Sequence, residues 1–242
     1  MNAKATMGWK ESLRLRLDRL LWRCAFTTLR VTASSLALLG GLLLLASAAG
    51  AATRYVNVNN PTPAAPYTSW ATAAATIQDA VDIAVAGEEI LVTNGVYQTG
   101  ARAVYGMSNR VAVTKPVTLR SVNGPDVTQI IGYQEPGTWD GNGPAAVRCV
   151  YLTNGAVLAG FTLTNGATQM RGDIVTNASG GGVWCEGLSA VVSNCVLTGN
   201  SADGGGGAYR GTLNNCTLTG NIAAQGGGAE SGMLNNCTLT GN

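Results

Sequence analysis

The chain has 242 residues, 12% of them charged and none of them histidine. The absence of histidine removes the usual acid–base group at neutral pH and the commonest protein ligand for metal ions. Without its first 51 residues, which are discussed next, the chain carries 8 basic and 11 acidic residues, a net charge of −3. This acidic balance argues against nucleic acid as a partner.

The first 51 residues have the order of a secretory signal peptide. Seven basic residues precede the apolar run SLALLGGLLLLASAAGAA, whose small residues supply cleavage sites. We predict a signal peptide over residues 1–51, cleaved after Ala51, and a protein that is secreted or held at the cell surface. The run is also close to the roughly 18–20 residues that span a bilayer, so an uncleaved anchor is the alternative. Membrane contact is expected only through this segment or through a region beyond residue 242.

The segment TAAATIQDAVDIAVA, about residues 72–86, has the spacing of an amphipathic helix. It places Ile77, Ala80, Val81 and Ala84 on one face, and Gly87 follows as a stop signal. We predict a short helix ahead of the first strand. It would cover the open N-terminal end of the structure that follows, whose bare strand edges would otherwise pair with other chains.

From about residue 88 to 190, strand-like segments recur at uneven spacing: EEILVTNG, KPVTLRSVNG, VRCVYLTNG and VLAGFTLTNG. Apolar and polar residues alternate within them, as in strands that bury one face. Asn-Gly pairs also occur in hairpins, but segments that recur in the same sense favour coils. The uneven spacing predicts irregular coils with loops of different length, a long one falling near 167–179.

From about residue 191 to 242 the spacing is regular. The phrase NNCTLTGN stands at 214–221 and at 235–242, and SNCVLTGN at 193–200, so the repeat is 21 residues long. A fixed period of this length is typical of solenoids. Each repeat is predicted to be one coil of a parallel β-helix, with equivalent residues stacked about 4.7–4.9 Å apart. The predicted fold is therefore all-β, a parallel β-helix with a short N-terminal capping helix, over residues 52–242.

The repeat also predicts ladders of identical side chains along the stack. Cysteine and leucine would stack inside, and asparagine side chains would bond from coil to coil at the corners. The ladder residues are Cys195, Cys216, Cys237, Leu197, Leu218, Leu239, Asn194, Asn215, Asn236, Asn200 and Asn221. The cysteines lack the close pairs and histidine partners of a zinc site, so no metal is predicted, and buried free thiols are favoured over disulfides. Cys149 and Cys185 are less regular and are open to pairing with each other.

Two stretches resemble known proteins. SWATAAATIQDAVDIAVAGEEILVTNGVY resembles the N-terminal cap and first coil of the pectin-lyase-like right-handed parallel β-helix superfamily, with matches at Ile77, Ala80, Gly87, Glu88, Ile90, Val92, Gly95 and Tyr97. Leu218-x-x-Asn221, followed by Gly227-Gly228-Ala229, is similar to the repeats of polymorphic outer-membrane proteins of the autotransporter type, with Leu in place of the usual Phe. The resemblance covers about residues 55–242 and implies right-handed coils. It does not imply one activity, because the superfamily includes lyases, hydrolases, esterases and adhesins.

Lyases of this superfamily neutralise a uronate carboxylate with Ca²⁺ or basic side chains and remove a proton with a base. The resemblance therefore implies that such an enzyme would need a convergent set of charged residues. The candidates in this chain are Arg110, Arg120, Asp126, Asp140 and Arg148. They follow no lyase or esterase motif, and solvated surface charge is the alternative interpretation.

Two functions stay open. Low charge, regular repeats and the lack of a convergent ionisable cluster favour a non-enzymatic exported protein, adhesin-like, that binds polysaccharide or a cell-surface glycan without a cofactor. The alternative is a pectate-lyase-like enzyme that degrades acidic polysaccharide with Ca²⁺. The last coil also lacks a polar cap or terminal helix in the sequence, so we expect a longer protein or a covering partner chain.

Overall fold

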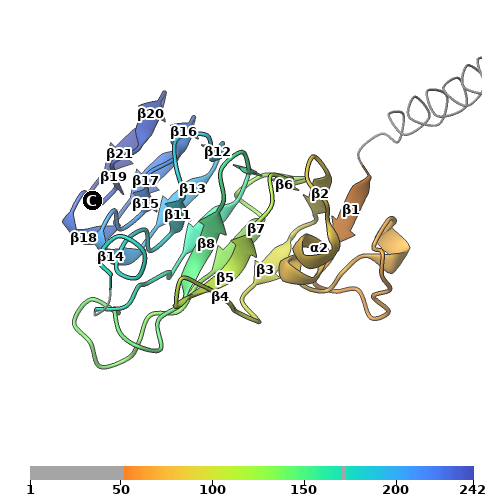
Figure 1. Cartoon of the computed structure of the whole chain (residues 1–242), viewed down its shortest axis with the longest axis horizontal. Helices are drawn as coiled ribbons and strands as arrows, with labels where there is room; N and C mark the ends of the chain where they lie inside the picture. The colour runs from red at the N-terminus through yellow and green to blue at the C-terminus, as the bar shows by residue number, and fades with distance from the viewer. Residues whose placement is uncertain (1–51, 171–172) are drawn as a thin grey trace, which may run out of the picture. The chain divides into compact units, whose positions relative to one another are not determined.

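Three sheets of short, stacked strands make up the part of the chain that the computed structural model describes, residues 52–170 and 173–242 (Figure 1). The predicted signal peptide, residues 1–51, lies outside the described residues. Sheet A consists of β1 (Thr53–Val56), β2 (Glu89–Val92), β6 (Thr118–Ser121), β9 (Val157–Ala159), β12 (Val191–Ser193), β16 (Thr212–Asn214) and β20 (Met233–Asn235). Sheet B consists of β3 (Gly95–Tyr97), β7 (Thr128–Ile131), β10 (Thr162–Thr164), β13 (Val196–Thr198), β17 (Thr217–Thr219) and β21 (Thr238–Thr240). Sheet C consists of β4 (Arg102–Val104), β5 (Met107–Val113), β8 (Arg148–Leu152), β11 (Val183–Cys185), β15 (Ala208–Tyr209) and β19 (Ala229–Glu230). A small fourth sheet pairs β14 (Ser201–Gly204) with β18 (Ile222–Gln225).

The strand pairing is that of a parallel β-helix. From β5 onward, strands that follow one another in the chain lie in different sheets. Each pairs with its equivalent one coil later: β9 with β12, β10 with β13, and β11 with β15. Within the named strands only the β4–β5 hairpin is antiparallel. The predicted all-β, right-handed parallel β-helix is confirmed; this is the hand that connections between parallel strands of one sheet nearly always take.

The core consists of columns of apolar side chains that run along the stack. In sheet B, Leu163 pairs in register with Leu197, Leu197 with Leu218, and Leu218 with Leu239. Leu197 and Leu218 are fully buried, whereas Leu239 in the last coil is about half exposed. Because no coil covers its own apolar face, each column is buried by the coils on either side of it.

Asparagines occupy two different corners of each coil. Asn194, Asn215 and Asn236 adopt the left-handed backbone conformation, with φ near 50°, in the turn between sheets A and B. Asparagine tolerates this conformation better than most residues, because its short polar side chain bonds locally. Their side chains are exposed, and Asn236 donates to Asn215 Oδ1 at 2.6 Å.

Asn200 and Asn221 lie at the other corner, where they are almost completely buried. The Asn200 side chain donates to Asn221 Oδ1 at 3.0 Å, and Asn221 donates to Asn242 Oδ1 at 2.8 Å. The Nδ2 groups of Asn200 and Asn221 also donate to the carbonyl oxygens of Leu163 and Leu197 in the coil before. This inner ladder therefore satisfies backbone groups in the interior that water cannot reach.

The cysteines form an interior column of free thiols. The thiols of Cys195, Cys216 and Cys237 each donate to the carbonyl oxygen two residues earlier, at 3.2 to 3.4 Å. Cys149 and Cys185, which were open to pairing, are separate buried thiols. Burial raises the pKa of both to about 12.

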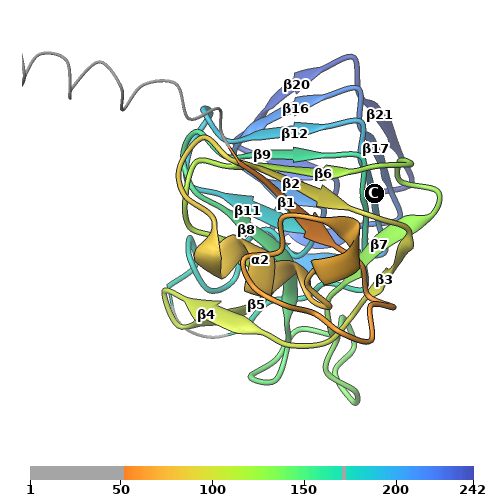
Figure 2. The same cartoon turned by 90° about the vertical axis from the view of Figure 1, so that its right-hand side faces the viewer.

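The N-terminal cap differs from the sequence-based expectation in two respects. A strand, β1, precedes the helix and pairs with β2, so the helix is not the first element. The helix α2 (Ile77–Ile83) is shorter than the expected range of 72–86, because Thr76 caps its N-terminus while Ser69 caps a separate 3-10 helix, Trp70–Thr72. Figure 2 shows α2 across the end of the coils. In the described part of the chain, no helix has both the length and the apolar character to cross a bilayer.

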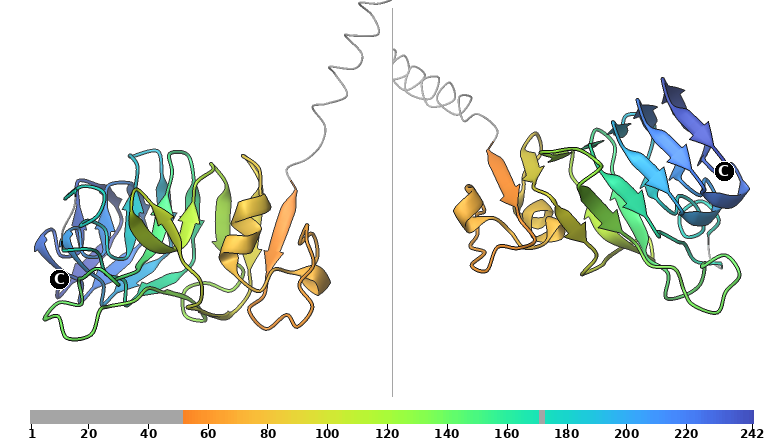
Figure 3. Two further views of the ribbon diagram at one scale, coloured as in Figure 1. Left: turned by 60° about the horizontal axis from the view of Figure 1, so that its bottom comes forward. Right: turned by 180° about the vertical axis from the view of Figure 1, so that it is seen from behind.

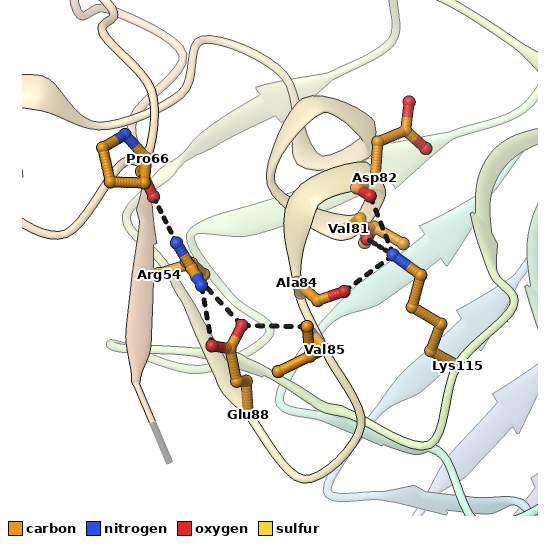
Figure 4. A network of polar contacts seen from close by, with 8 residues as sticks. All are labelled: Arg54, Pro66, Val81, Asp82, Ala84, Val85, Glu88 and Lys115. Carbon is orange, nitrogen blue, oxygen red and sulfur yellow. Dashed lines mark hydrogen bonds and ion pairs between the residues drawn. The ribbon is translucent and has the colours of Figure 1, made fainter. Parts of the chain in front are cut away.

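Polar side chains fix this cap to the first coils (Figure 4). Arg54 of β1 donates to both carboxylate oxygens of Glu88, at 2.9 and 2.7 Å. Lys115 donates to three carbonyl oxygens at the C-terminal end of α2. Gln78 of α2 bonds to the edge of β5, accepting the Ala112 N–H at 2.8 Å and donating to the Ala112 carbonyl at 3.4 Å. The cap thus pairs backbone groups that a bare end would leave open.

Candidate functional site

The candidate catalytic residues lie on different parts of the coil stack. Arg120, on sheet A, donates to Glu89 Oε1 at 2.9 Å, and both side chains are partly exposed. Asp126 is exposed in the turn before β7. Arg110, on β5, donates to the carbonyl oxygen of Ile131 at 2.7 Å, and burial lowers its pKa. These three residues thus lie on separate elements, and Arg110 lines a small hollow with Thr76 and Gln78 of the N-terminal cap.

Arg148 is a structural residue in the interior. Its side chain is 1% exposed and donates to the carbonyl oxygens of Gly180, Thr176 and Ser179 and to Asn109 Oδ1, all at 2.7 to 2.9 Å. Burial lowers its pKa to about 9, while four oxygen acceptors favour the charged form. These bonds use four of the five guanidinium N–H groups and hold the segment that precedes β11 against β5 and β8. At 1% exposure the side chain is out of reach of a substrate.

A column of aromatic rings on sheet C is also buried and so not accessible to a ligand. Tyr151, Trp184 and Tyr209 lie in register on successive coils, and their rings stack with centroids 5.4 and 6.4 Å apart. All three are at least nine-tenths buried. The Trp184 indole N–H donates to the Val175 carbonyl at 2.7 Å, and Glu186 accepts the Tyr151 hydroxyl. We therefore assign this column to packing rather than to ligand binding.

The most open polar surface surrounds the loop between β7 and β8, residues 132–147, called here the Trp139 loop. This loop extends beyond the strands, and it is drawn in green in Figures 1 and 3. Trp139 stands on it with 84% of its surface exposed, the largest fraction among the exposed large apolar residues described. An indole this open offers a ligand a flat apolar face with a polar N–H at its edge.

The Trp139 loop is braced at its base and along its length. Tyr133 and Val147 exchange two backbone hydrogen bonds of 2.9 Å at its base. Asn142 is 3% exposed and donates to Asp140 Oδ2 at 2.8 Å and to Ser201 Oγ at 3.1 Å. Its Oδ1 accepts the Thr168 N–H at 2.9 Å. Asn142 therefore connects the loop to two later coils and holds it in one conformation.

Two adjoining hollows flank Trp139, and we call them together the Trp139 groove. The hollow on one side has a volume of about 430 Å³ and the other of about 220 Å³. Both are lined by Trp139, Asp140 and Ile222. The polar side chains that line one or the other include Gln134, Glu135, Thr138, Asp140, Asn142, Gln169, Ser201 and Asp203. The groove thus combines one open aromatic face with carboxylates and amides from two neighbouring coils.

The charges that line the groove are all negative. Glu135, Asp140 and Asp203 contribute carboxylates, and no lysine or arginine is among the described residues that line it. Glu135 and Asp140 each accept hydrogen bonds from the loop itself, through Ala145 N–H and Asn142. A carboxylate has about four acceptor positions, so both retain capacity for a ligand. Within residues 52–170 and 173–242, no three His, Cys, Asp or Glu side chains converge on a metal position.

Of the five candidate catalytic residues, the structure brings only Asp140 to this groove. Trp139 was missed by sequence reasoning, as were Gln134 and Gln169. The available signal was weak: a tryptophan within the glycine- and proline-rich stretch EPGTWDGNGP, between two predicted coils. Loops of this composition between regular elements are where binding residues concentrate.

No protein-family model matches this sequence, and no curated protein matches it in sequence. Several solved structures align with part of it. A variant of pectin methylesterase in complex with a hexasaccharide aligns with a TM-score of 0.46 and 18% identity, over 77% of this chain and 54% of that one. A second complex of pectin methylesterase with a hexasaccharide gives a TM-score of 0.45 at 18% identity, with the same coverage. A rhamnogalacturonan lyase gives 0.43 at 13% identity, over 77% of this chain and 51% of that one.

This chain spans about half the length of each of these proteins. The parallel β-helix itself follows from the strand pairing within this chain, and the candidate site follows from its own side chains. That site is the Trp139 groove on the outside of the coils.

Proposed function

We propose that this protein binds a glycan in the Trp139 groove. The observation that carries the proposal is the exposed indole of Trp139 on a braced loop, with an open hollow on either side. A sugar ring presents C–H groups on one face and hydroxyls at its rim. An aromatic face packs against the C–H groups. Carboxylates accept hydrogen bonds from the hydroxyls, and amides both accept from them and donate to them. This combination of one apolar platform and a few polar groups suits a sugar better than a wholly apolar ligand.

The bracing of the loop adds to the proposal. A ligand that must order a loop on binding loses affinity to the entropy of that ordering. The Trp139 loop is already fixed through Asn142, Tyr133 and Val147. Residues of both the β14 and the β18 coil line the groove, so a chain of sugars laid along it would contact more than one coil.

Binding rather than cleavage is the function we favour. The guanidinium groups of Arg110 and Arg148 are occupied by backbone carbonyls, while Arg120 donates to Glu89 through Nε and is not among the described residues that line the Trp139 groove. A lyase acting on uronate polymers would need such groups free. With the signal peptide expected over residues 1–51, we propose a secreted or surface-held glycan-binding protein.

The test is titration of soluble oligosaccharides by calorimetry, with Trp139→Ala compared against Trp70→Ala. Trp70 is the matched control: it is also partly exposed, but it packs against Tyr55 in the N-terminal cap. We expect one or more oligosaccharides to bind, Trp139→Ala to weaken binding at least about tenfold as for a central interface aromatic, and Trp70→Ala to leave it unchanged. Equal binding by wild type and Trp139→Ala, or no binding at all, would overturn the proposal.

A separate assay addresses the lyase alternative. Incubation with polygalacturonate, with and without added Ca²⁺, is expected to release no unsaturated ends that absorb in the ultraviolet. Calcium-dependent release of such ends would make the protein a lyase.

A further inference from the structure

The charge of the Trp139 groove narrows the class of glycan that it accepts. Its three carboxylates come from two separate segments: Glu135 and Asp140 from the Trp139 loop and Asp203 from β14. A fourth, Glu230, lies against Gly204, the residue after Asp203. The negative charge therefore extends along the groove rather than standing at one end of it.

No described positive side chain lines the groove to offset this charge. Two of the described arginines are engaged elsewhere: Arg148 in the interior, and Arg210 over the ring of Tyr209 at 5.2 Å. An acidic sugar that entered would therefore meet like charges at short range. Like-charge juxtaposition is one way in which a binding site rejects a wrong ligand.

We infer that the Trp139 groove takes glycans free of uronic acids, with protonated amino sugars bound more tightly than neutral sugars, and rejects polyuronates. The inference rests on the proposed function, because it assigns a ligand class to the same groove. Neutral sugars keep the packing on Trp139 and the hydrogen bonds to the carboxylates. Amino sugars add attraction to Glu135, Asp140 and Asp203, and uronates add repulsion from them.

The experiment compares the binding of three hexasaccharides of equal length: one of galacturonate, one of a neutral hexose and one of glucosamine. At low ionic strength we expect the galacturonate oligomer to bind about tenfold more weakly than the neutral one, and the glucosamine oligomer more tightly than either. Because salt screens exposed charges beyond about 10 Å at 0.1 M, raising the salt should strengthen galacturonate binding, weaken glucosamine binding and leave neutral binding unchanged.

Substitutions test whether the carboxylates of the groove cause the difference between neutral and galacturonate affinity. The double variant Asp140→Asn, Asp203→Asn should reduce the ratio between neutral and galacturonate affinity several-fold. Asp126→Asn removes one exposed carboxylate outside the groove and should leave the ratio unchanged. Galacturonate binding as tight as neutral binding, or tightened by lower salt, would overturn the inference while the proposed function stood. No binding by any of the three hexasaccharides, with none by a wider panel, would remove the proposed function and the inference together.

Discussion

The side-chain Nδ2 of Asn200 donates to Oδ1 of Asn221, one 21-residue repeat later in the chain, at 3.0 Å. Asn221 Oδ1 also accepts the backbone N–H of Asn200 at 3.1 Å, and Asn221 Nδ2 donates to the Leu197 carbonyl at 2.9 Å. The buried Asn221 side chain thus satisfies two backbone groups and the Asn200 amide, all in the coil before its own. The 21-residue repeat therefore places each buried asparagine where it can bond to its equivalent in the next coil.

Replacing Asn221 with alanine should destabilise the protein by about 3 kcal/mol, because it leaves the buried N–H groups of Asn200 without an acceptor. Urea unfolding at neutral pH measures this. Asn235→Ala is the control, since its side chain also bonds to the preceding coil, at Asn214, but is exposed. We expect a loss below about 1 kcal/mol for the control. Equal losses in the two variants would mean that the buried ladder is not what stabilises the stack.

Replacing Glu88 with glutamine should destabilise the cap by about 3 kcal/mol at pH 7, because it leaves the mostly buried Arg54 without its charged partner. The hydrogen bonds from Arg54 lower the pKa of Glu88. A lowered folded-state pKa stabilises the protein above the unfolded value, near 4.3, and this stabilisation is lost as the pH falls through the folded value. The difference between wild type and variant should therefore shrink in acid.

Glu89→Gln is the matched control for this pair. Glu89 bonds to Arg120 in an ion pair in which both side chains are more than one-third exposed. Exposed pairs contribute about 1 kcal/mol or less. Unfolding midpoints at pH 7 and pH 3 for the two variants give the comparison, and a Glu88→Gln effect as small as that of Glu89→Gln would contradict the prediction.

The wild-type protein should lose stability in alkali relative to Cys149→Ala. Burial raises the pKa of Cys149 to about 12, whereas an unfolded cysteine titrates near 8.5. Since the folded pKa is the higher one, the stabilisation is complete below the unfolded value and declines as the pH rises toward 12, by up to about 1.4 kcal/mol per pH unit. Unfolding of both proteins between pH 8 and 10.5 measures the difference. A difference that stays constant over that range would show that the thiol ionises freely in the folded state.

The repeat predicted the stacking because each coil pairs only with the coils next to it. Val196, Thr217 and Thr238 stand at equivalent positions of the repeat, and the structure pairs them in register. In the regular part of the stack each coil meets a neighbour of nearly the same sequence, so the spacing alone determines which residues pair. The cap was harder to predict. Strand β1 belongs to sheet A only because it pairs with β2, and the paired residues Thr53 and Glu89 are 36 positions apart in the chain.

The site could not be predicted for a related reason. The Trp139 loop has no repeat to set its conformation, and its brace joins Asn142 to Ser201, 59 residues further along the chain. Contacts of that separation leave no periodic signal. Charged residues drew attention to Arg110, Arg120 and Arg148, yet their guanidinium groups are bound to the protein itself.

Replacing Asn142 with alanine should weaken glycan binding without removing any ring of the platform. The substitution deletes the bonds to Ser201 and Thr168 that hold the Trp139 loop, so a ligand must order the loop as it binds. We expect a loss of stability of about 2 kcal/mol and an affinity lower by about fivefold to tenfold. Asn123→Ala, an exposed asparagine that bonds to Asn94, should change neither. Unchanged affinity in Asn142→Ala would show that the bonds of Asn142 to Ser201 and Thr168 do not contribute to glycan binding.

The central claim is that a glycan contacts Trp139, and fluorine NMR tests it most directly. The protein is labelled with 5-fluorotryptophan, the Trp139 resonance is assigned with Trp139→Phe, and a neutral hexasaccharide is added. We predict that the Trp139 resonance shifts on saturation while those of Trp70 and the buried Trp184 stay in place. A shift at Trp70 or Trp184 with Trp139 unmoved, at a concentration where binding is measured, would place the ligand elsewhere and contradict the account.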